Sequence, residues 1–565
     1  MIAISLRAFK LLSQEVRGLH TAFYVLAFVA FLTAVVGLLR DRLLAHVFGA
    51  SATLDIYYAA FRVPDLIFVA LGALVSVYIL IPGLARRSEE AKRDYIDTII
   101  AGFFIFTILI CGLAYFLAPV ILPLFFPAFV INGSMPALLT LTRIMLLQPI
   151  LFGFSNIFAA ITQSRKRYLL YSISPLLYNL GIIVGTVFLY PRMGITGLAW
   201  GVVFGALMHA GIQVPSILDD GFFRRFPKLR EPRALAETVF VSVPRALALS
   251  MSEIAELGLI ALAGLLAPGS ISIFIFAYNL QSVPLSIIGS SYSVAAFPTL
   301  AAALAAGRRN EFIAHTATAA RSVVFWSLPA TALVIVLRAH LVRVILGSGA
   351  FNWTDTRLTA AAFALFSVSL VAQGLALLIV RAYYAAGRTF VPFFVSAATA
   401  ALTILFGAAS IGALHTMPVV GEFASAILRV SEVPGTSVLA LAFAYTLVSI
   451  IGTVALLWHF EYRFAGFLKL VWRGWGESLL ASVTCGAVAY ATLVAVGPIT
   501  LSSTVLTVFL RGLAGGIAGI VACTLIYALL GNREYRETTA ALHGRLRRVS
   551  LAPTIVAAAE EHPIP

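Results

Sequence analysis

Long apolar segments alternate with short polar connections along almost the whole chain. Each apolar run holds about 20 or more residues, enough for a helix to cross roughly 30 Å of hydrocarbon. The alternating ten-residue segments typical of an outer-membrane barrel are absent. Because backbone groups in lipid must pair internally, the pattern predicts an all-α polytopic membrane protein.

We expect about fourteen membrane-spanning helices, arranged as two pseudo-symmetric six-helix lobes with two helices appended. The expected spans are 23–47, 56–85, 96–127, 136–163, 168–190, 195–217, 234–266, 269–300, 312–346, 357–386, 389–414, 437–459, 474–497 and 504–531. The expected divisions are an amphipathic N-terminal helix (1–22), an N-lobe (23–217), a C-lobe (234–459), the last two spans (474–531) and a cytoplasmic tail (532–565).

Composition and charge agree with this picture. Apolar residues make up 61% of the 565 and charged residues only 11%, against about a quarter in soluble domains. The net charge of +15 comes mostly from Lys and Arg in alternate loops, such as 86–93, 165–167, 224–233 and 463–473, and from the tail between Arg533 and Arg548. The positive-inside rule then places both termini in the cytoplasm, and we reject nucleic acid as a partner.

Two stretches look alike about 220 residues apart. Phe61–Pro64 with Ile81–Ala85 resembles Leu280–Pro284 with Phe297–Ala301, and Ser164-Arg165 resembles Gly387-Arg388. An offset of six spans gives both copies the same orientation. The similarity therefore predicts a parallel repeat around a central cavity, which is a transporter plan.

Ionisable residues inside a span usually face a cavity or a partner because exposure to lipid is costly. Arg40, Asp55 and Arg62 lie near the ends of the first two spans, and we expect them to line one cavity, with snorkelling at a span end as the other interpretation. Arg245 lies well inside span 7, and Asn279 and Gln281 lie in span 8. For Arg143, in span 4, we favour packing or an interface.

Several arginines with few acids would suit a phosphate or pyrophosphate headgroup, because the guanidinium is a forked and permanently charged donor. Glu253 and Glu256 in span 7 keep a drug or cation exporter open. No catalytic or metal-ligand cluster stands out, no loop could hold a catalytic domain, and we expect no cofactor. The three cysteines fall inside apolar spans, where they pack as small side chains.

Three motifs are more specific. They comprise Gly37–Asp41, Val47–Ala50, Asp55 and Ala59–Pro64; then Gly349–Phe351, Asp355-Thr356, Gln373–Leu375, Arg381–Ala385 and Arg388-Thr389; then Ala267–Ser270, Phe276-Ala277, Pro284, Gly289 and Phe297-Pro298. Together they resemble the MurJ (MviN) family of the multidrug/oligosaccharidyl-lipid/polysaccharide flippase superfamily. The resemblance covers spans 1 to 11, whereas spans 12 to 14 match only in number.

The resemblance implies a flippase of the bacterial plasma membrane that carries lipid II, an undecaprenyl-pyrophosphate-linked glycan, from the cytoplasmic to the outer face. It implies alternating access around a cationic cavity, driven by membrane potential or an ion rather than ATP, and no P-loop is present. It assigns Arg40, Asp55 and Arg62 to the substrate. Pro64, Gly72, Pro284 and Gly289 are the expected hinge residues, with a static kink as the other interpretation of each.

Three positions depart from the family pattern. In span 8, where the family has an arginine, this chain reads Ala277-Tyr278-Asn279. A second arginine of the family, in span 1, is replaced by Ala34, and a third, just after the proline of span 2, is replaced by the apolar residues Ile67–Val69. We hypothesise that Arg245 supplies the missing charge. A flippase for another undecaprenyl-linked polysaccharide, a drug exporter, and a non-transporting scaffold for cell-wall synthesis enzymes remain the alternatives.

Overall fold

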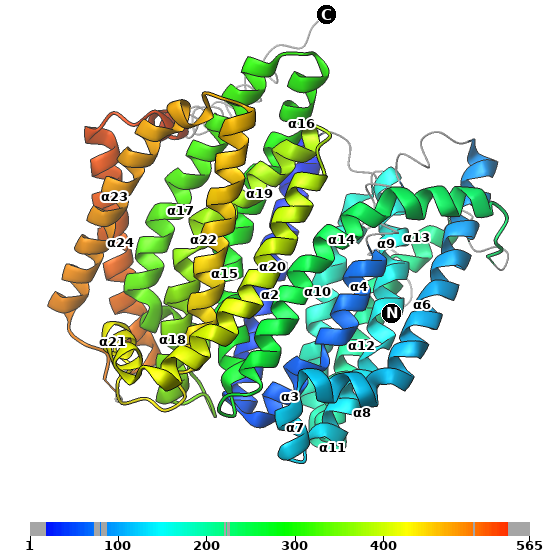
Figure 1. Ribbon diagram of the computed structural model, residues 1–565, viewed down its shortest axis with the longest axis horizontal. Coiled ribbons are helices and arrows are strands. Elements are labelled where there is room, and N and C mark those ends of the chain that lie inside the picture. Colours follow the sequence, from blue (N-terminus) through cyan, green and yellow to red (C-terminus); the bar gives the residue numbers. More distant parts are fainter. Residues whose placement is uncertain are drawn as a thin grey trace, which may run out of the picture. The chain divides into compact units, whose positions relative to one another are not determined.

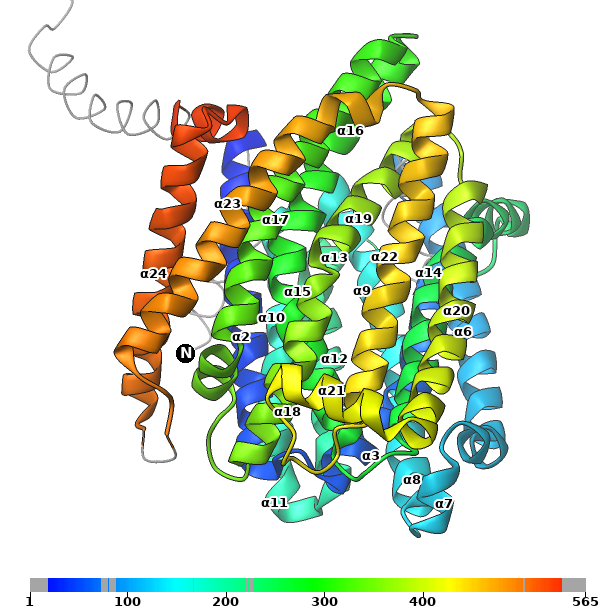
Figure 2. The same ribbon diagram turned by 60° about the vertical axis from the view of Figure 1, so that its left-hand side comes forward.

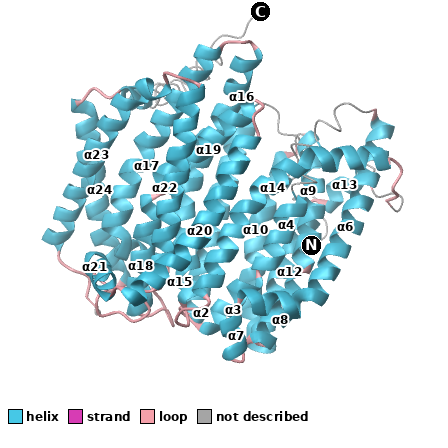
Figure 3. Cartoon of the chain, in the orientation of Figure 1, coloured by secondary structure: helices cyan, strands magenta, loops and turns pink. Residues whose placement is uncertain are grey.

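A computed structural model describes residues 19–72, 80, 88–165, 167–219, 222, 227–500 and 503–540. Within these ranges every regular element is a helix and none is a strand, so the expected all-α class is confirmed (Figure 3). The predicted N-terminal helix lies almost entirely outside the described residues, as does the tail beyond residue 540.

The chain divides into two compact units, which we describe separately. Unit 1 holds residues 1–280, 345–366 and 389–448, and unit 2 holds residues 281–344, 367–388 and 449–565. Helices α15 (Ser270–Leu285), α18 (Trp353–Val368) and α22 (Val438–Arg463) contribute residues to both units. The predicted division into two six-helix lobes and two appended helices therefore stays a prediction.

The other helices fall within one unit each, except that Ile345, the last residue of α17, belongs to unit 1 (Figure 1). Unit 1 contains α2 (Leu19–Phe48), α3 (Ala52–Ala60), α4 (Arg62–Gly72), α6 (Glu89–Phe125), α7 (Pro127–Ile131), α8 (Met135–Met145), α9 (Leu147–Ser164), α10 (Tyr168–Val184), η1 (Gly185–Leu189), α11 (Tyr190–Met193), α12 (Ile195–Gly211), α13 (Val214–Asp219), α14 (Pro232–Ala263), α20 (Phe390–Thr416) and α21 (Pro418–Leu428). Unit 2 contains η2 (Ser286–Ser290), α16 (Ser291–Ala305), α17 (Arg309–Ile345), α19 (Leu370–Ala385), α23 (Phe467–Val496) and α24 (Val505–Leu529).

Twelve of the expected spans have a counterpart among the candidate membrane-spanning helices. Eleven helices are long and apolar enough to cross a membrane, and the pair α18 and α19 forms a twelfth if it is one bent span. They correspond to the third through fourteenth predicted spans. The first predicted span lies within α2, which is not among these candidates, and the second ends outside the described residues, so the total of fourteen stays a prediction.

Several predicted spans are interrupted rather than continuous. Span 2 breaks at Phe61, between α3 and α4, and span 4 breaks at Leu146, between α8 and α9. Spans 5 and 8 each pass through a five-residue π-helix, η1 and η2. Such irregular turns inside a helix loosen the regular ladder of hydrogen bonds, and they are frequent at functional sites.

In unit 1, α10 and its continuation η1 pack backbone against backbone with α12. A Cβ atom placed on Gly181 would lie 2.2 Å from the Cα of Gly205, and one on Gly185 would lie 2.5 Å from the Cα of Gly201. Small residues allow this approach, which is a common way for membrane helices to associate without a hydrophobic driving force. Helices α14 and α20 of the same unit also run side by side (Figures 1 and 2).

In unit 2, the last two helices form a closely packed hairpin (Figure 2). Phe325 of α17 packs in one cluster with side chains of α23 and α24, including the free and buried Cys485 and Cys523. Beside this cluster, Arg321 donates from Nε to Glu534 at 2.5 Å, and both side chains are nearly buried. The ion pair fastens the segment after α24 to α17.

Two short helices were not predicted. Helix α21 lies between spans 11 and 12, and its Val419, Phe423 and Ile427 are each more than 60% exposed. Helix α7 follows α6 and exposes Ile131. Their apolar side chains recur at helical spacing but over too few residues to cross a membrane, which suits helices lying at its surface.

Candidate functional site

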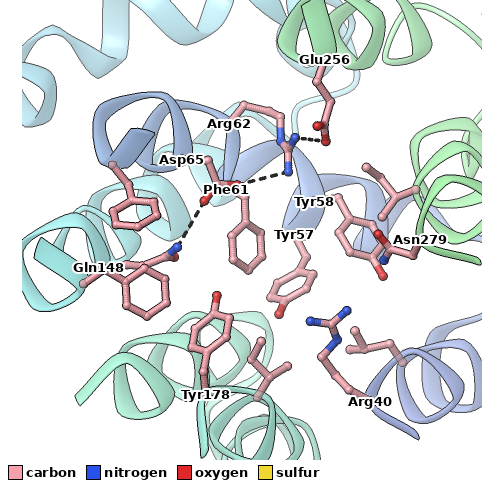
Figure 4. Close-up of a pocket in the computed structure, with 15 residues that line it drawn as sticks. Arg40, Tyr57, Tyr58, Phe61, Arg62, Asp65, Gln148, Tyr178, Glu256 and Asn279 are labelled. Carbon is pink, nitrogen blue, oxygen red and sulfur yellow. Dashed lines mark hydrogen bonds and ion pairs between the residues drawn. The ribbon is translucent and has the colours of Figure 1, made fainter. Parts of the chain in front are cut away.

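Unit 1 contains a partly open cavity of about 280 Å³ (Figure 4). Its walls come from α2, α3, α4, α9, α10, α14 and α15. The lining residues are Arg40, Leu44, Tyr57, Tyr58, Phe61, Arg62, Asp65, Phe68, Gln148, Phe152, Tyr178, Ile182, Glu256, Ile275 and Asn279. Three of the residues predicted to bind substrate, Arg40, Arg62 and Asn279, are therefore brought together.

Arg62 is held by two carboxylates. Its Nη1 donates to Oε1 of Glu256 on α14, and its Nη2 donates to Oδ2 of Asp65 at 3.3 Å (Figure 4). Gln148 donates from Nε2 to the other oxygen of Asp65 at 3.2 Å. Because Arg62 is the first residue of α4, the break at Phe61 sets the direction of its side chain. The Nε of Arg62 is buried and has no hydrogen-bond partner among the described residues.

Arg40 is held in the same manner on the other side of the cavity. Its Nε and Nη2 donate to Oδ1 of Asp41 at 2.9 and 2.7 Å, and its Nη1 donates to Oδ1 of Asn179 at 2.8 Å. Asn279 donates from Nδ2 to the second oxygen of Asp41 at 3.1 Å. The sequence comparison above led us to expect an arginine near Asn279, and in the structure this amide instead supports the partner of Arg40.

Tyrosine hydroxyls fill the space between the two arginines. The Tyr57 and Tyr178 hydroxyls point into the middle of the cavity (Figure 4). The Tyr58 hydroxyl is buried and has no hydrogen-bond partner within the described ranges. Together with the guanidinium groups they offer a set of donors suited to oxygen-rich ligands such as phosphates or sugars.

The charges of the cavity wall balance. The lining contains two arginines, Arg40 and Arg62, and two acids, Asp65 and Glu256. The expectation of several arginines with few acids is therefore wrong for this cavity, because each arginine carries its own carboxylate partner. An anionic ligand must replace these carboxylates rather than enter a preformed positive site.

Asp55 does not line the cavity, contrary to the prediction. It is buried, and its two oxygens accept from the amide of Gly269 at 2.6 Å and from the amide and hydroxyl of Ser272 at 2.8 and 2.6 Å. These groups belong to the first turn of α15, where amides lack partners within the helix. Asp55 is thus a helix cap supplied by another segment, and it does not pair with an arginine here.

The three motifs of the sequence converge at this place. Ala350 donates from its amide to the His46 carbonyl at 2.9 Å, and Asp355 accepts from the amides of Ala50 and Asn352 at 3.3 and 3.1 Å. A Cβ atom on Gly349 would lie 2.3 Å from the His46 carbonyl oxygen, so only glycine fits this contact. We call the segments 46–55, 267–272 and 349–355 the three-segment junction.

The remaining predicted residues lie elsewhere. Arg245 falls within α14, but its side chain lies outside the described residues. Gln281 belongs to unit 2, where it is fully buried and both of its amide atoms lack a hydrogen-bond partner among the described residues. Neither residue is therefore placed in the cavity.

The four predicted hinge residues lie at or near irregular backbone. Pro64 is in the first turn of α4, directly after the break at Phe61, and Gly72 is the last residue of α4. Pro284 is next to last in α15, and Gly289 lies inside η2. Whether the backbone bends at these places during a cycle stays a prediction.

Sequence reasoning missed much of the cavity wall. Asp41, Asn179 and Asp65 hold the arginines and Gln148 holds Asp65, yet none was selected as a site residue from the sequence. The available signal was their occurrence as polar residues within apolar spans. Among the described residues, no group of three or more His, Cys, Asp or Glu side chains could hold a metal ion.

Comparisons with known proteins point to one family. The family model described as "Lipid II flippase MurJ" matches residues 44–514. A probable lipid II flippase MurJ of Thermotoga maritima is 27% identical over 390 residues, which cover 67% of this chain and 77% of that protein. The lipid II flippase MurJ of Burkholderia cenocepacia is 24% identical over 373 residues, covering 63% and 71%.

Solved structures show the same fold. A lipid II flippase MurJ in an inward-closed conformation matches with a TM-score of 0.71 and 20% identity, over 90% of this chain and 99% of that one. An inward-facing multidrug resistance MATE family transporter of the MOP superfamily matches with a TM-score of 0.61 and 14% identity, over 77% and 96%.

Proposed function

Because the chain belongs to the lipid II flippase MurJ family, we propose that it carries lipid II from the cytoplasmic to the outer face of a bacterial plasma membrane. The chain is a multi-pass membrane protein of a transporter family. The charged loops support an orientation with both termini in the cytoplasm.

The observation that carries the proposal is the cavity with Arg40 and Arg62 on opposite sides. Each guanidinium is already held by hydrogen bonds to side-chain oxygens, so its direction is fixed before a ligand arrives. A pyrophosphate offers the same kind of oxygen acceptors with more charge, and it can replace Asp41 and Glu256 in a bidentate manner.

The cycle follows from this exchange. The headgroup enters from the cytoplasmic side, its pyrophosphate takes over Arg40 and Arg62, and the lipid tail stays in the bilayer. Bending at Pro64, Gly72, Pro284 and Gly289 then exposes the headgroup outside. On release, the carboxylates recapture the arginines, so the empty site has no unpaired guanidinium and release is favoured.

Membrane potential is the proposed driving force, without a cofactor. Moving one elementary charge across the membrane is worth about 2.3 kcal/mol per 100 mV, so an anionic headgroup is driven outward by a potential that is negative inside. Arg245 remains our candidate for the charge missing from span 8.

The test is rescue of a bacterium depleted of its own lipid II flippase. We expect the wild-type chain to rescue growth, and Arg40→Ala and Arg62→Ala to fail at equal membrane expression. Arg192→Ala is the matched control, because Arg192 is an exposed arginine on α11 that, among the described residues, donates to the Phe188 carbonyl alone. Failure of Arg245→Ala would support its role in charge compensation.

Three results would count against the proposal. Absence of rescue by correctly inserted wild type, with transport of another undecaprenyl-linked glycan in vesicles, would assign a different polysaccharide. Rescue by Arg40→Ala and Arg62→Ala alike would refute the role of the two arginines. Absence of both rescue and glycan transport by correctly inserted wild type, with co-purification of cell-wall synthesis enzymes, would favour a scaffold that does not transport.

A further inference from the structure

Arg143 of α8 contacts α6 and does not line the cavity. Helix α6 beside it is strongly apolar, yet only 28% of its most apolar window is buried. Its exposed Leu109, Leu113, Phe116 and Val120 recur every three or four residues and so form one face. An exposed apolar face on a membrane-spanning helix is a surface for lipid.

The guanidinium of Arg143 is fixed against α6. It lies over the ring of Tyr115 at 4.5 Å from the ring centre, and its Nε donates to the Tyr115 carbonyl at 3.4 Å. Pro119, four residues later in α6, has no N–H to bond that carbonyl. Arg143 therefore replaces a hydrogen bond that the proline removes, which explains why an arginine is tolerated at this position.

Four of the five N–H donors of Arg143 remain. Within the described part of the chain, Arg143 forms no ion pair with a carboxylate and no hydrogen bond besides the one to Tyr115. A charged group without an acceptor is costly next to hydrocarbon. The outer edge of the guanidinium thus needs an anionic oxygen that the described protein does not provide.

The depth of Arg143 identifies where that oxygen comes from. Helix α8 begins at Met135, directly after the polar turn 132–134. Arg143 follows eight residues later, or about 12 Å along the helix. Side chains on a helix lean towards its N-terminus, and the long stem of arginine reaches further in that direction. The guanidinium therefore reaches towards the headgroup region at the α7 end of the unit.

We propose that Arg143, stacked on Tyr115, binds the phosphate of a phospholipid in this leaflet. The phosphate accepts from the two Nη atoms as a fork, while the acyl chains lie along the exposed face of α6. In the orientation given above this is the outer leaflet. The site is separate from the cavity and does not depend on which headgroup is transported.

The experiment is lipid titration of the purified full-length protein, followed by native mass spectrometry. The probes are phosphatidylglycerol and diacylglycerol, which share acyl chains and differ in the phosphate headgroup. We expect wild type to bind phosphatidylglycerol more tightly than diacylglycerol. Arg143→Gln should bind phosphatidylglycerol about tenfold more weakly than wild type, and Arg143→Lys should recover part of this loss. Tyr115→Leu keeps the carbonyl but removes the ring, so it should weaken binding by a smaller factor.

Arg192→Gln is the control for a general loss of positive charge. The inference is overturned if Arg143→Gln keeps the wild-type affinity while folded, if Arg192→Gln weakens binding equally, or if diacylglycerol binds as well as phosphatidylglycerol. It is also overturned if Arg143 instead retains an acidic membrane-protein partner that excludes lipid. Unfolding temperatures measured without lipid separate lost binding from lost folding.

Discussion

Asp55 offers the sharpest test, because sequence and structure give it different roles. In the structure it caps α15 through three hydrogen bonds of 2.6, 2.8 and 2.6 Å. In Asp55→Asn the remaining oxygen can still accept from Ser272, but the new NH₂ group faces the amide of Gly269. Two donors then face each other in a buried place, and the charge that strengthened the other bonds is lost.

The magnitude follows from these losses. A buried donor without an acceptor costs about 1–3 kcal/mol, and neutral hydrogen bonds are roughly half as strong as charge-assisted ones. We expect the free energy of unfolding to fall by about 2–4 kcal/mol, which lowers the unfolding temperature of a chain of 565 residues by roughly 2–3 °C. Ser272→Ala removes only the hydroxyl donor and should cost about 1 kcal/mol.

The assay is thermal unfolding of the purified full-length protein in detergent, reported by a thiol-reactive dye. Cys111, Cys485 and Cys523 are free and buried, so they react only when their surroundings open. The folded variant should still bind the headgroup. A variant with the wild-type unfolding temperature that no longer binds it would refute the cap and restore Asp55 as a substrate contact.

Three further substitutions test other features of the two units. Glu256→Gln removes a charged partner of Arg62, so inorganic pyrophosphate should bind about threefold more tightly by isothermal titration calorimetry. Gly201→Ala places a Cβ atom 2.5 Å from facing backbone, so the unfolding free energy should fall by about 1–3 kcal/mol in thermal scans. Glu534→Ala leaves Arg321 nearly buried and without its partner, so the same scans should show a loss of about 3 kcal/mol.

Each of these has a matched control. Glu237 is exposed on α14, so Glu237→Gln should not alter pyrophosphate binding. Gly112→Ala meets no atom within 4 Å and should be neutral or slightly stabilising in α6. Glu537→Ala breaks an exposed ion pair with Arg533 and should cost at most about 0.5 kcal/mol. Equal effects of a substitution and its control would contradict the structural reason given for it.

The membrane-spanning helices could be predicted because lipid requires long apolar segments, and composition alone shows where these lie. The breaks at Phe61 and Leu146 have a local signal that the predicted continuous spans ignored. Pro64 and Pro149 follow them by three residues, and each proline lacks the N–H that would bond the carbonyl four residues earlier. The short helices α7 and α21 were not predicted, because they are too short to be read as spans and too apolar to be read as typical loops.

The cavity was predicted in part. Arg40 and Arg62 stand out as charges near the ends of apolar spans, and both line it. Their carboxylate partners could not be paired from the sequence, because Arg62 and Glu256 are 194 positions apart. Asp55 was misplaced because a carboxylate close to two arginines in the sequence suggests an ion pair. The unfilled amides of α15, more than 200 positions away, satisfy it instead.

The three-segment junction also limits where the chain can be altered. An epitope or fluorescent tag inserted between His46 and Asp55 would pull apart bonds to two distant segments at once. The turn at Gly133 is different, because no atom lies within 4 Å of the Cβ position there. A topology reporter placed at Gly133 should therefore leave the protein folded, whereas the same reporter at Gly49 should abolish its accumulation in the membrane.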